Sequence, residues 1–160
     1  MKLSTHEKKM LCEKYFDMVY RLCLMRVKDV HICEDVTQDV FLKFLKTDRE
    51  FESKEHIKAW LIKVAINTSK SFFTSSWFKK SEPLREDIVF TSYESQDLYS
   101  KVKLLSKKHR TVIHLFYYED MSIKDIALVL KRKESTVKSD LFRARKELKK
   151  LLGGKENYEF

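Results

Sequence analysis

A run of cationic and hydroxyl side chains near the C-terminal end has the residue types of a surface that binds double-stranded DNA. Apolar residues recur there at helical spacing and form one stripe: Val137, Leu141, Ala144 and Leu148. Hydrogen-bond donors and one phenylalanine occupy the opposite face: Lys138, Ser139, Phe142, Arg143, Arg145 and Lys146. Arg and Lys reach guanine edges, Ser serves several bases, and Phe contacts the thymine methyl. The pattern predicts a DNA-reading helix, although an amphipathic helix with a merely solvated basic face has the same periodicity.

Shorter elements before this helix complete a helix-turn-helix pattern. A helix is expected over 98–105, and Ser106 is placed to cap the helix that follows it. Ser122 begins a Ser-x-x-Asp sequence that resembles a capping box and opens a further short helix. A polar turn over 131–134 separates that helix from the last one. Glu134 or Ser135 is expected to cap the last helix. In a helix-turn-helix the second helix enters the major groove.

Residues 56–80 show a second pattern that is typical of nucleic-acid contact. The segment holds no acidic residue, and its cations alternate with aromatic rings: Lys58, Trp60, Lys63, Lys70, Phe72, Phe73, Trp77, Phe78, Lys79 and Lys80. Cations that follow a phosphate backbone, beside aromatic planes on which unpaired bases stack, are the features of single-stranded DNA binding. Aromatic residues at helical spacing are also common in cores, and Trp60 is expected to be mostly buried.

An acidic helix is expected before this basic segment, starting near Glu34. One side of it has the apolar stripe of a buried face: Val36, Val40, Phe41, Phe44 and Leu45. The other side is predicted to be exposed: Asp35, Gln38, Asp39, Leu42 and Lys43. Acids near a helix N-terminus suit the helix dipole, and an exposed edge of this kind equally suits a protein partner. The periodicity does not choose between these two interpretations.

The composition favours an all-α protein without an active site or cofactor. In 160 residues there are only 2 Gly and 1 Pro, too few for the turns of a β-sandwich or barrel. Because both glycines, Gly153 and Gly154, lie near the C-terminal end, no Gly-rich phosphate loop or G-x-S-x-G motif can be drawn. The cysteines Cys12, Cys23 and Cys33 form no C-x-x-C and are expected to be free, buried thiols. No metal site is predicted.

The charge distribution predicts two small basic helical domains joined by a flexible acidic linker. The net charge is +9, and residues 1–80, 81–97 and 98–160 carry balances of +5, −4 and +8. The middle stretch also holds the only proline, Pro83, and has weak apolar periodicity. A long surface loop within one domain is the alternative. Two basic domains indicate a polyanionic partner, since Lys and Arg neutralise phosphates.

The N-terminal residues 1–9 lack the apolar core of a signal peptide. No apolar run in the chain approaches the roughly 20 residues that are needed to cross a bilayer. We therefore expect a cytoplasmic protein without membrane insertion.

Four segments, in the right order, resemble the sigma-70 family of bacterial transcription initiation factors. Residues 33–43 (CEDVTQDVFLK) are similar to the polymerase-binding helix of the family, and residues 58–67 (KAWLIKVAIN) to its promoter-melting and −10 recognition helix. Residues 122–127 (SIKDIA) and 135–146 (STVKSDLFRARK) resemble its −35-binding helix-turn-helix. The chain length and the presence of only these two domains are similar to the extracytoplasmic-function (ECF) subgroup.

The resemblance implies a role for each residue that matches the family's motifs. Residues 1–80 become a region 2-like domain, whose contacts with core polymerase are Asp35, Gln38, Asp39 and Lys43. Recognition and melting of the −10 element in that domain fall on Trp60, Lys63, Asn67 and Lys70, helped by the loop 47–55. Residues 98–160 become a region 4-like domain, whose −35 contacts are Thr136, Lys138, Ser139, Phe142, Arg143 and Arg145. Thr136 and Arg145 are expected nearer the phosphates.

Five residues depart from the family's pattern. Ser106 and Lys107 stand where the family often has two prolines before the third helix from the end. Lys131 and Arg132 stand in the helix-turn-helix turn where the family usually has Gly and an apolar residue. Without that Gly another residue must adopt the geometry of the turn, at some cost in strain. Asp140 stands where a basic residue is common, which is expected to weaken phosphate contact locally.

The implied function is that of an ECF-type RNA polymerase sigma factor. The core polymerase performs catalysis, and this protein directs recognition of the −10 and −35 elements and helps to open the DNA. Its implied partners are core RNA polymerase, promoter DNA and an anti-sigma factor, and the free chain is expected to be monomeric. Two alternatives remain: a free-standing helix-turn-helix transcriptional regulator, and a protein-interaction module whose basic faces are only solvated.

Overall fold

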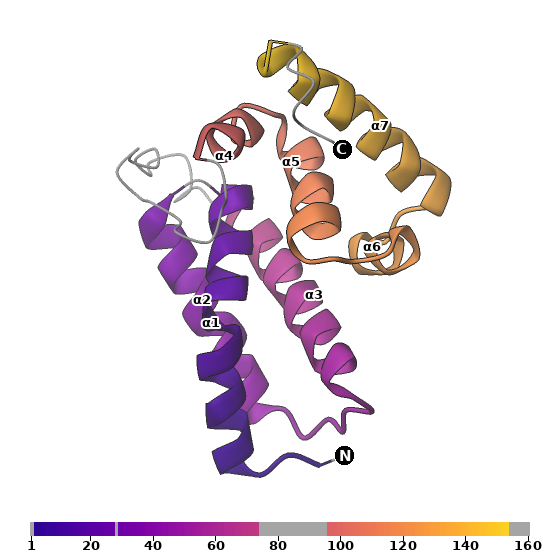
Figure 1. Cartoon of the computed structure of the whole chain (residues 1–160). Coiled ribbons are helices and arrows are strands. Elements are labelled where there is room, and N and C mark those ends of the chain that lie inside the picture. The colour runs from indigo at the N-terminus through magenta and orange to yellow at the C-terminus, as the bar shows by residue number, and fades with distance from the viewer. Residues whose placement is uncertain (1, 28, 74–95, 154–160) are drawn as a thin grey trace. The chain divides into compact units, whose positions relative to one another are not determined.

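Helices are the only regular elements in the part of the chain that the computed structural model describes, which is residues 2–27, 29–73 and 96–153 (Figure 1). The chain divides into two compact units, unit 1 (Met1–Leu84) and unit 2 (Arg85–Phe160). The predicted all-α class with two small helical domains is therefore confirmed. Within the described ranges, no helix combines the length and the apolarity that a bilayer crossing requires.

In unit 1, residues 2–27 and 29–73 are described, and they form three helices that pack side by side (Figure 1): α1 (Thr5–Val27), α2 (Val30–Lys46) and α3 (Lys54–Phe73). Apolar residues at helical spacing line their facing sides. The largest fully buried side chains of this unit are Leu22, Leu24, Met25, Ile32, Phe44, Phe51, Ile57, Leu61, Ile62 and Ile66. Phe51 lies in the connection between α2 and α3, so its burial holds that connection against the core.

Helix α2 begins at Val30, four residues before its predicted start. Asp29 is the reason, because its Oδ1 accepts a hydrogen bond from the Ile32 N–H at 3.0 Å and so caps the helix. The C-terminal end of α2 is also satisfied, since Lys8 Nζ donates to the carbonyl oxygens of Leu45 and Thr47. The side chain of Leu45, predicted to be buried, is exposed.

Over residues 96–153, the described part of unit 2 contains four α-helices and one π-helical turn: α4 (Gln96–Val102), α5 (Lys107–Ile113), η2 (His114–Tyr118), α6 (Ile123–Leu130) and α7 (Glu134–Leu151). Two predicted caps are confirmed, since the Ser106 and Ser122 side chains accept hydrogen bonds from backbone N–H groups at 3.4 and 3.1 Å. Helix α4 spans Gln96–Val102 rather than the predicted 98–105. The predicted linker, residues 81–97, lies outside the described residues except for the first two residues of α4.

The turn between α6 and α7 contains a strained residue. Lys131 adopts φ 56° and ψ 47°, the left-handed region that favours glycine. The N–H groups of Lys131 and Arg132 donate to the carbonyls of Leu128 and Ala127 at 3.4 and 3.0 Å, which is the hydrogen-bond pattern of a Schellman motif. Helix α7 follows with Lys133 at its N-cap and no side-chain cap, so the predicted capping by Glu134 or Ser135 is wrong.

Candidate nucleic-acid interface

Five of the six side chains that were predicted to lie opposite the apolar stripe of α7 are exposed. Lys138, Ser139, Phe142, Arg143 and Lys146 are exposed, and Phe142 is 67% exposed, which is unusual for so large an apolar side chain. The opposite side is buried through Val137, Leu141, Ala144 and Leu148, as predicted. Thr136, the remaining predicted residue of the first turn, is half-buried. Helix α7 thus offers cations, a hydroxyl and an aromatic ring to the solvent on one face.

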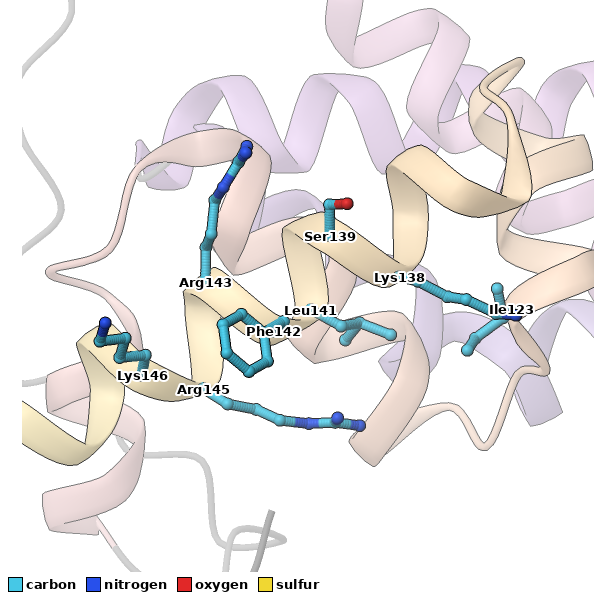
Figure 2. A pocket seen from close by; sticks show the side chains of 8 residues that line it. All are labelled: Ile123, Lys138, Ser139, Leu141, Phe142, Arg143, Arg145 and Lys146. Atoms are coloured by element: carbon cyan, nitrogen blue, oxygen red, sulfur yellow. The ribbon is translucent and has the colours of Figure 1, made fainter.

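A surface hollow of about 700 Å³ lies on this face and extends to α6. It is lined by Ile123, Lys138, Ser139, Leu141, Phe142, Arg143, Arg145 and Lys146. Figure 2 shows Lys138 reaching from α7 toward Ile123 of α6, while Arg143 and Arg145 leave the helix in different directions. Ile123 was not anticipated from the sequence, because only the fold brings the first residue of α6 beside α7. The hollow combines apolar surface with hydrogen-bond donors, as contact with base edges requires.

Arg145 is held in place by aromatic side chains of η2. Its Nε donates to the Tyr117 hydroxyl at 2.6 Å, and its guanidinium carbon lies 5.4 Å and 5.5 Å from the ring centres of Phe116 and Tyr117. Arg145 is half-buried, so it is more restricted than the exposed Arg143. A guanidinium has five N–H donors, and the bond to Tyr117 uses one of them. The arrangement suits an arginine that meets a phosphate in a fixed position.

Asp140 is buried in unit 2 at 1% exposure. The Arg132 Nη1 donates to its Oδ2 at 3.3 Å, and the Lys108 Nζ lies 3.3 Å from its Oδ1. From its sequence position, Asp140 is expected only to weaken phosphate contact locally. The structure shows instead that its carboxylate is directed into the unit and is partly neutralised there by the two cations.

Helix α3 presents the second predicted interface. Lys63, Asn67 and Lys70 are exposed and, with Trp60, lie on one side of the helix because their spacing follows its period. The opposite side is buried in the core of unit 1 through Ile57, Leu61, Ile62, Ala65 and Ile66. Phe72 and Phe73 belong to the end of α3, but their side chains, and all of residues 74–80, lie outside the part that can be described.

Trp60 is only partly exposed, which agrees with the prediction that it is mostly buried. Its ring lies 5.9 Å from Phe44 at 49°, and 5.7 Å from Phe51 at 82°, measured between ring centres. Edge-to-face contacts of this kind hold one side of the indole rigidly. Trp60 keeps part of its surface exposed, so it is suited to stacking with a base from a fixed position.

The predicted protein-binding edge of α2 is accessible. Asp35, Gln38 and Lys43 are exposed, and Asp39 is half-buried. Lys43 Nζ lies 3.0 Å from Asp39 Oδ2 and donates to Thr68 Oγ1 at 3.2 Å, so this side chain also joins α2 to α3.

An apolar groove of about 640 Å³ runs beside this edge, between α1 and α2. Its lining residues are Cys12, Glu13, Phe16, Asp17, Gln38, Phe41, Leu42 and Leu45. Phe16 and Phe41 stack with their ring centres 6.0 Å apart, and Leu42 is 51% exposed. The predicted exposure of Leu42 is confirmed. The exposed Phe16 was missed, because the helical period of α1 does not show which part of its apolar face lacks a partner.

The cysteines are free, as predicted, and Cys23 and Cys33 are buried while Cys12 is half-buried. Burial raises the pKa of Cys23 to about 12, and burial likewise raises the pKa of Cys33. Thiols in this environment are poor nucleophiles and poor metal ligands. Within the described ranges, His, Cys, Asp and Glu side chains do not gather in groups of three that could hold a metal ion.

Comparison with known proteins assigns both units. Residues 11–78 match the family model for sigma-70 region 2, and residues 95–148 match the model for sigma-70 region 4. The chain is 27% identical to the ECF RNA polymerase sigma factor SigW of Bacillus subtilis, with 86% of this chain and 84% of SigW covered. It is 29% identical to the RNA polymerase sigma factor SigV of the same organism, over 79% and 80% of the two chains.

Solved structures show the same fold at lower identity. The sigma factor RpoE of Bartonella quintana, in complex with the anti-sigma factor NepR, aligns with a TM-score of 0.74 and 22% identity over 91% of this chain and 96% of RpoE. CnrH, in complex with the cytosolic domain of CnrY, aligns with a TM-score of 0.64 and 21% identity over 96% and 92%. With both regions matched in order and relatives aligned over most of their length, the chain belongs to the sigma-70 family of RNA polymerase sigma factors, within its ECF group.

Proposed function

We propose that this protein binds core RNA polymerase, directs it to promoters by contacting the −35 and −10 elements, and helps to open the DNA at initiation. The observation that carries the proposal is that one chain presents two basic helix faces with exposed or accessible aromatic rings, on α7 and on α3, in two separate compact units. The polymerase supplies the chemistry, so this chain needs only to bind and position.

Unit 2 is proposed to read the −35 element as duplex DNA. Lys138, Ser139 and Arg143 are exposed donors on one face of α7, and the exposed Phe142 adds an apolar surface for a thymine methyl. Thr136 and Arg145 are assigned to the phosphates, and the fixed guanidinium of Arg145 supports that role.

Unit 1 is proposed to hold the −10 element partly single-stranded. Lys63 and Lys70 would follow the backbone, Asn67 would hydrogen-bond a base edge, and Trp60 would stack with an unpaired base. Base–aromatic stacking contributes about 1–3 kcal/mol per base, enough to help keep a base out of the duplex. Phe51, in the connection between α2 and α3, contacts the ring of Trp60. This contact supports a role for the connection in reading a flipped base.

Core polymerase is proposed to bind the edge of α2 formed by Asp35, Gln38, Asp39 and Lys43. The apolar groove beside Gln38 supports this assignment, since exposed apolar surface next to polar groups is typical of protein interfaces. Action on the polymerase would place the protein in the cytoplasm. We also propose an anti-sigma factor as a regulatory partner, as RpoE of Bartonella quintana has in NepR.

Reconstitution with core polymerase tests the proposal. The parent chain is expected to form a complex with core enzyme and to start transcripts at defined positions on genomic DNA, mapped by sequencing of their 5′ ends. The double variant Asp35→Ala, Gln38→Ala is expected to weaken the complex at least about tenfold, since central interface residues commonly cost more than 1 kcal/mol. Glu147→Gln, which removes an exposed acid from unit 2, is the matched control and is expected to bind core enzyme as the parent does.

Two outcomes would contradict the proposal. Specific promoter binding by the free chain, with no association with core enzyme at any salt concentration, would indicate a free-standing regulator. Absence of any salt-dependent DNA affinity, with or without polymerase, would indicate an interaction module with merely solvated basic faces, because phosphate contacts make DNA affinity fall steeply with salt.

A further inference from the structure

Asp140 is a feature of unit 2 that the proposed contacts do not explain. It follows Ser139 of the DNA-reading face in the sequence of α7, yet it lies on the buried side of the helix and is 1% exposed. A buried carboxylate is stable only when cations or hydrogen-bond donors compensate for the lost water. The groups that compensate for this charge are in turn held in place by it.

Two cations from different segments meet the carboxylate. Arg132 Nη1 donates a hydrogen bond to Oδ2 at 3.3 Å, and Lys108 Nζ lies 3.3 Å from Oδ1. Arg132 belongs to the turn between α6 and α7, whereas Lys108 belongs to the first turn of α5. Asp140 therefore joins the DNA-reading helix both to the turn before it and to the helix that supports it.

The turn depends on this contact more than an ordinary turn would. Lys131 is in the left-handed region at φ 56°, which costs free energy for any residue other than glycine. A Schellman motif is commonly completed by an apolar contact from the residue after the left-handed one. That residue is Arg132, and its side chain reaches Asp140 instead. The ion pair thus takes the place of the apolar contact, so the two departures at Arg132 and Asp140 form one structural feature.

We infer that Asp140 is a positioning residue that orients α7 for reading the −35 element, and that it raises sequence discrimination while lowering overall DNA affinity. The inference rests on the proposed function. Discrimination follows from geometry, because Asp140 lies next to Ser139 and one helical turn before Arg143, so a rotation of α7 at this point displaces both. The lower affinity follows from charge.

The carboxylate neutralises part of the charge of two cations that remain accessible to solvent. The side chains of Arg132 and Lys108 are 33% and 47% exposed. Cations near phosphates raise the affinity for DNA of any sequence. Removal of the Asp140 charge is therefore expected to leave non-specific binding unchanged or stronger while it weakens the preference for the correct sequence. Neither unfolding nor a purely electrostatic role produces this combination.

The test compares Asp140→Asn with the parent, each as the full chain bound to core polymerase. The probes are a promoter identified by transcript mapping and the same DNA with a scrambled −35 element. Affinity for the scrambled DNA is expected to stay the same or to rise. The ratio of affinities, intact over scrambled, is expected to fall about tenfold, comparable with the loss of one correct base pair. Glu147→Gln removes an exposed acid from the same helix and is expected to leave the ratio unchanged.

A second variant separates positioning from folding. Arg132→Met combined with Asp140→Leu replaces the ion pair by an apolar contact of similar volume, a change that folded proteins often tolerate. If Asp140 acts by positioning, this pair restores most of the lost ratio, and circular dichroism shows the helical content of the parent. An unchanged ratio in Asp140→Asn, or a ratio that the apolar pair does not restore, would overturn the inference. Failure of the parent chain itself to bind the intact promoter with polymerase would instead overturn the proposed function.

Discussion

Units 1 and 2 both present a basic helix face, but their helices differ in length. Unit 1 packs helices of 23, 17 and 20 residues, and its largest buried side chains are aliphatic and aromatic. Beside α7, with 18 residues, unit 2 has four elements of only 5 to 8 residues. Both interiors also include polar and charged side chains: Arg26, Asp29, Thr37, Thr68 and Ser69 in unit 1, and Arg110, Thr111, His114, Glu119 and Asp140 in unit 2.

The difference shows two ways of orienting a recognition helix. Long helices bury continuous apolar faces, so α3 is oriented mainly by the volume and shape of the core of unit 1, to which the buried hydrogen bond from Arg26 Nε to Ser69 Oγ, 2.9 Å long, adds. Short helices bury less apolar area each, so directional contacts contribute a larger share of the orientation in unit 2. Arg110 donates to the Leu105 carbonyl at 2.7 Å, Arg145 donates to Tyr117 at 2.6 Å, and Asp140 holds Arg132. We therefore expect unit 1 to be sensitive to lost volume and unit 2 to be sensitive to lost polar partners.

The largest effect is expected from Phe44→Ala in unit 1. Phe44 is fully buried and lies 5.9 Å from the rings of both Phe51 and Trp60. Its truncation removes transfer free energy and leaves a cavity, and we expect unit 1 to lose about 3–5 kcal/mol of its free energy of unfolding. Hydrogen exchange read by mass spectrometry should show the loss in α1, α2 and α3 and unchanged protection in unit 2.

Phe142→Ala is the matched control for this variant, since Phe142 is 67% exposed. Substitution at an exposed position is expected to change stability by no more than about 0.5 kcal/mol. A loss of protection in unit 2 of the Phe44→Ala variant would contradict the independence of the two units on which the comparison depends.

Arg143→Ala is expected to have the next largest effect, on DNA binding rather than stability. If Arg143 reads a guanine, its loss costs about 1–3 kcal/mol at one base pair of the −35 element and relaxes the preference there. Affinities of the reconstituted holoenzyme for a set of single-base promoter variants measure this. An equal loss of affinity on all −35 sequences would indicate that Arg143 contacts a phosphate. Lys149 is an exposed cation further along α7, so Lys149→Ala is the control for the loss of charge alone.

The buried thiols predict a pH dependence that is confined to unit 1. Burial raises the pKa of Cys23 from 9.0 to about 12, so between these values the unfolded chain releases a proton that the folded chain retains. Stability is complete below pH 9 and falls as pH rises above it, by about 1.4 kcal/mol per thiol at pH 10. Urea unfolding at pH 8 and pH 10 should show that Cys23→Ala removes this part of the loss. The same pH dependence in parent and variant would refute it.

The smallest effect is expected from Lys131→Gly, which relieves the left-handed residue of unit 2. Glycine adopts φ 56° without steric cost but loses more conformational entropy on folding. The balance should raise the free energy of unfolding of unit 2 by about 0.5–1 kcal/mol. Lys133→Gly is the control, since Lys133 has φ −70° and glycine there should be neutral or destabilising. Thermal unfolding measures the change in stability of unit 2 in both variants. Equal changes in stability for Lys131→Gly and Lys133→Gly would show that the turn is not strained.

Much of the fold could be predicted because its determinants lie within a few residues of one another. The caps Ser106 and Ser122 act on N–H groups three residues ahead, and the apolar stripe of α7 repeats within each turn. The start of α2 was missed because Asp29 was not considered as its cap. Capping of α7 was predicted wrongly because Glu134 and Ser135, although suitable in type, lie inside the helix.

The candidate site divides in the same way. Exposure of Lys138, Phe142 and Arg143 follows from helical period alone, because each residue lies about 100° from the next around the axis. The burial of Asp140 and the clamp on Arg145 do not follow from that period. The two partners of Asp140 lie 8 and 32 residues away in the sequence, and the partner of Arg145 lies 28 residues away. Only folding brings these partners within hydrogen-bond distance. Local spacing therefore sufficed to find the reading face, whereas packing between segments determined which of its charges are held in place.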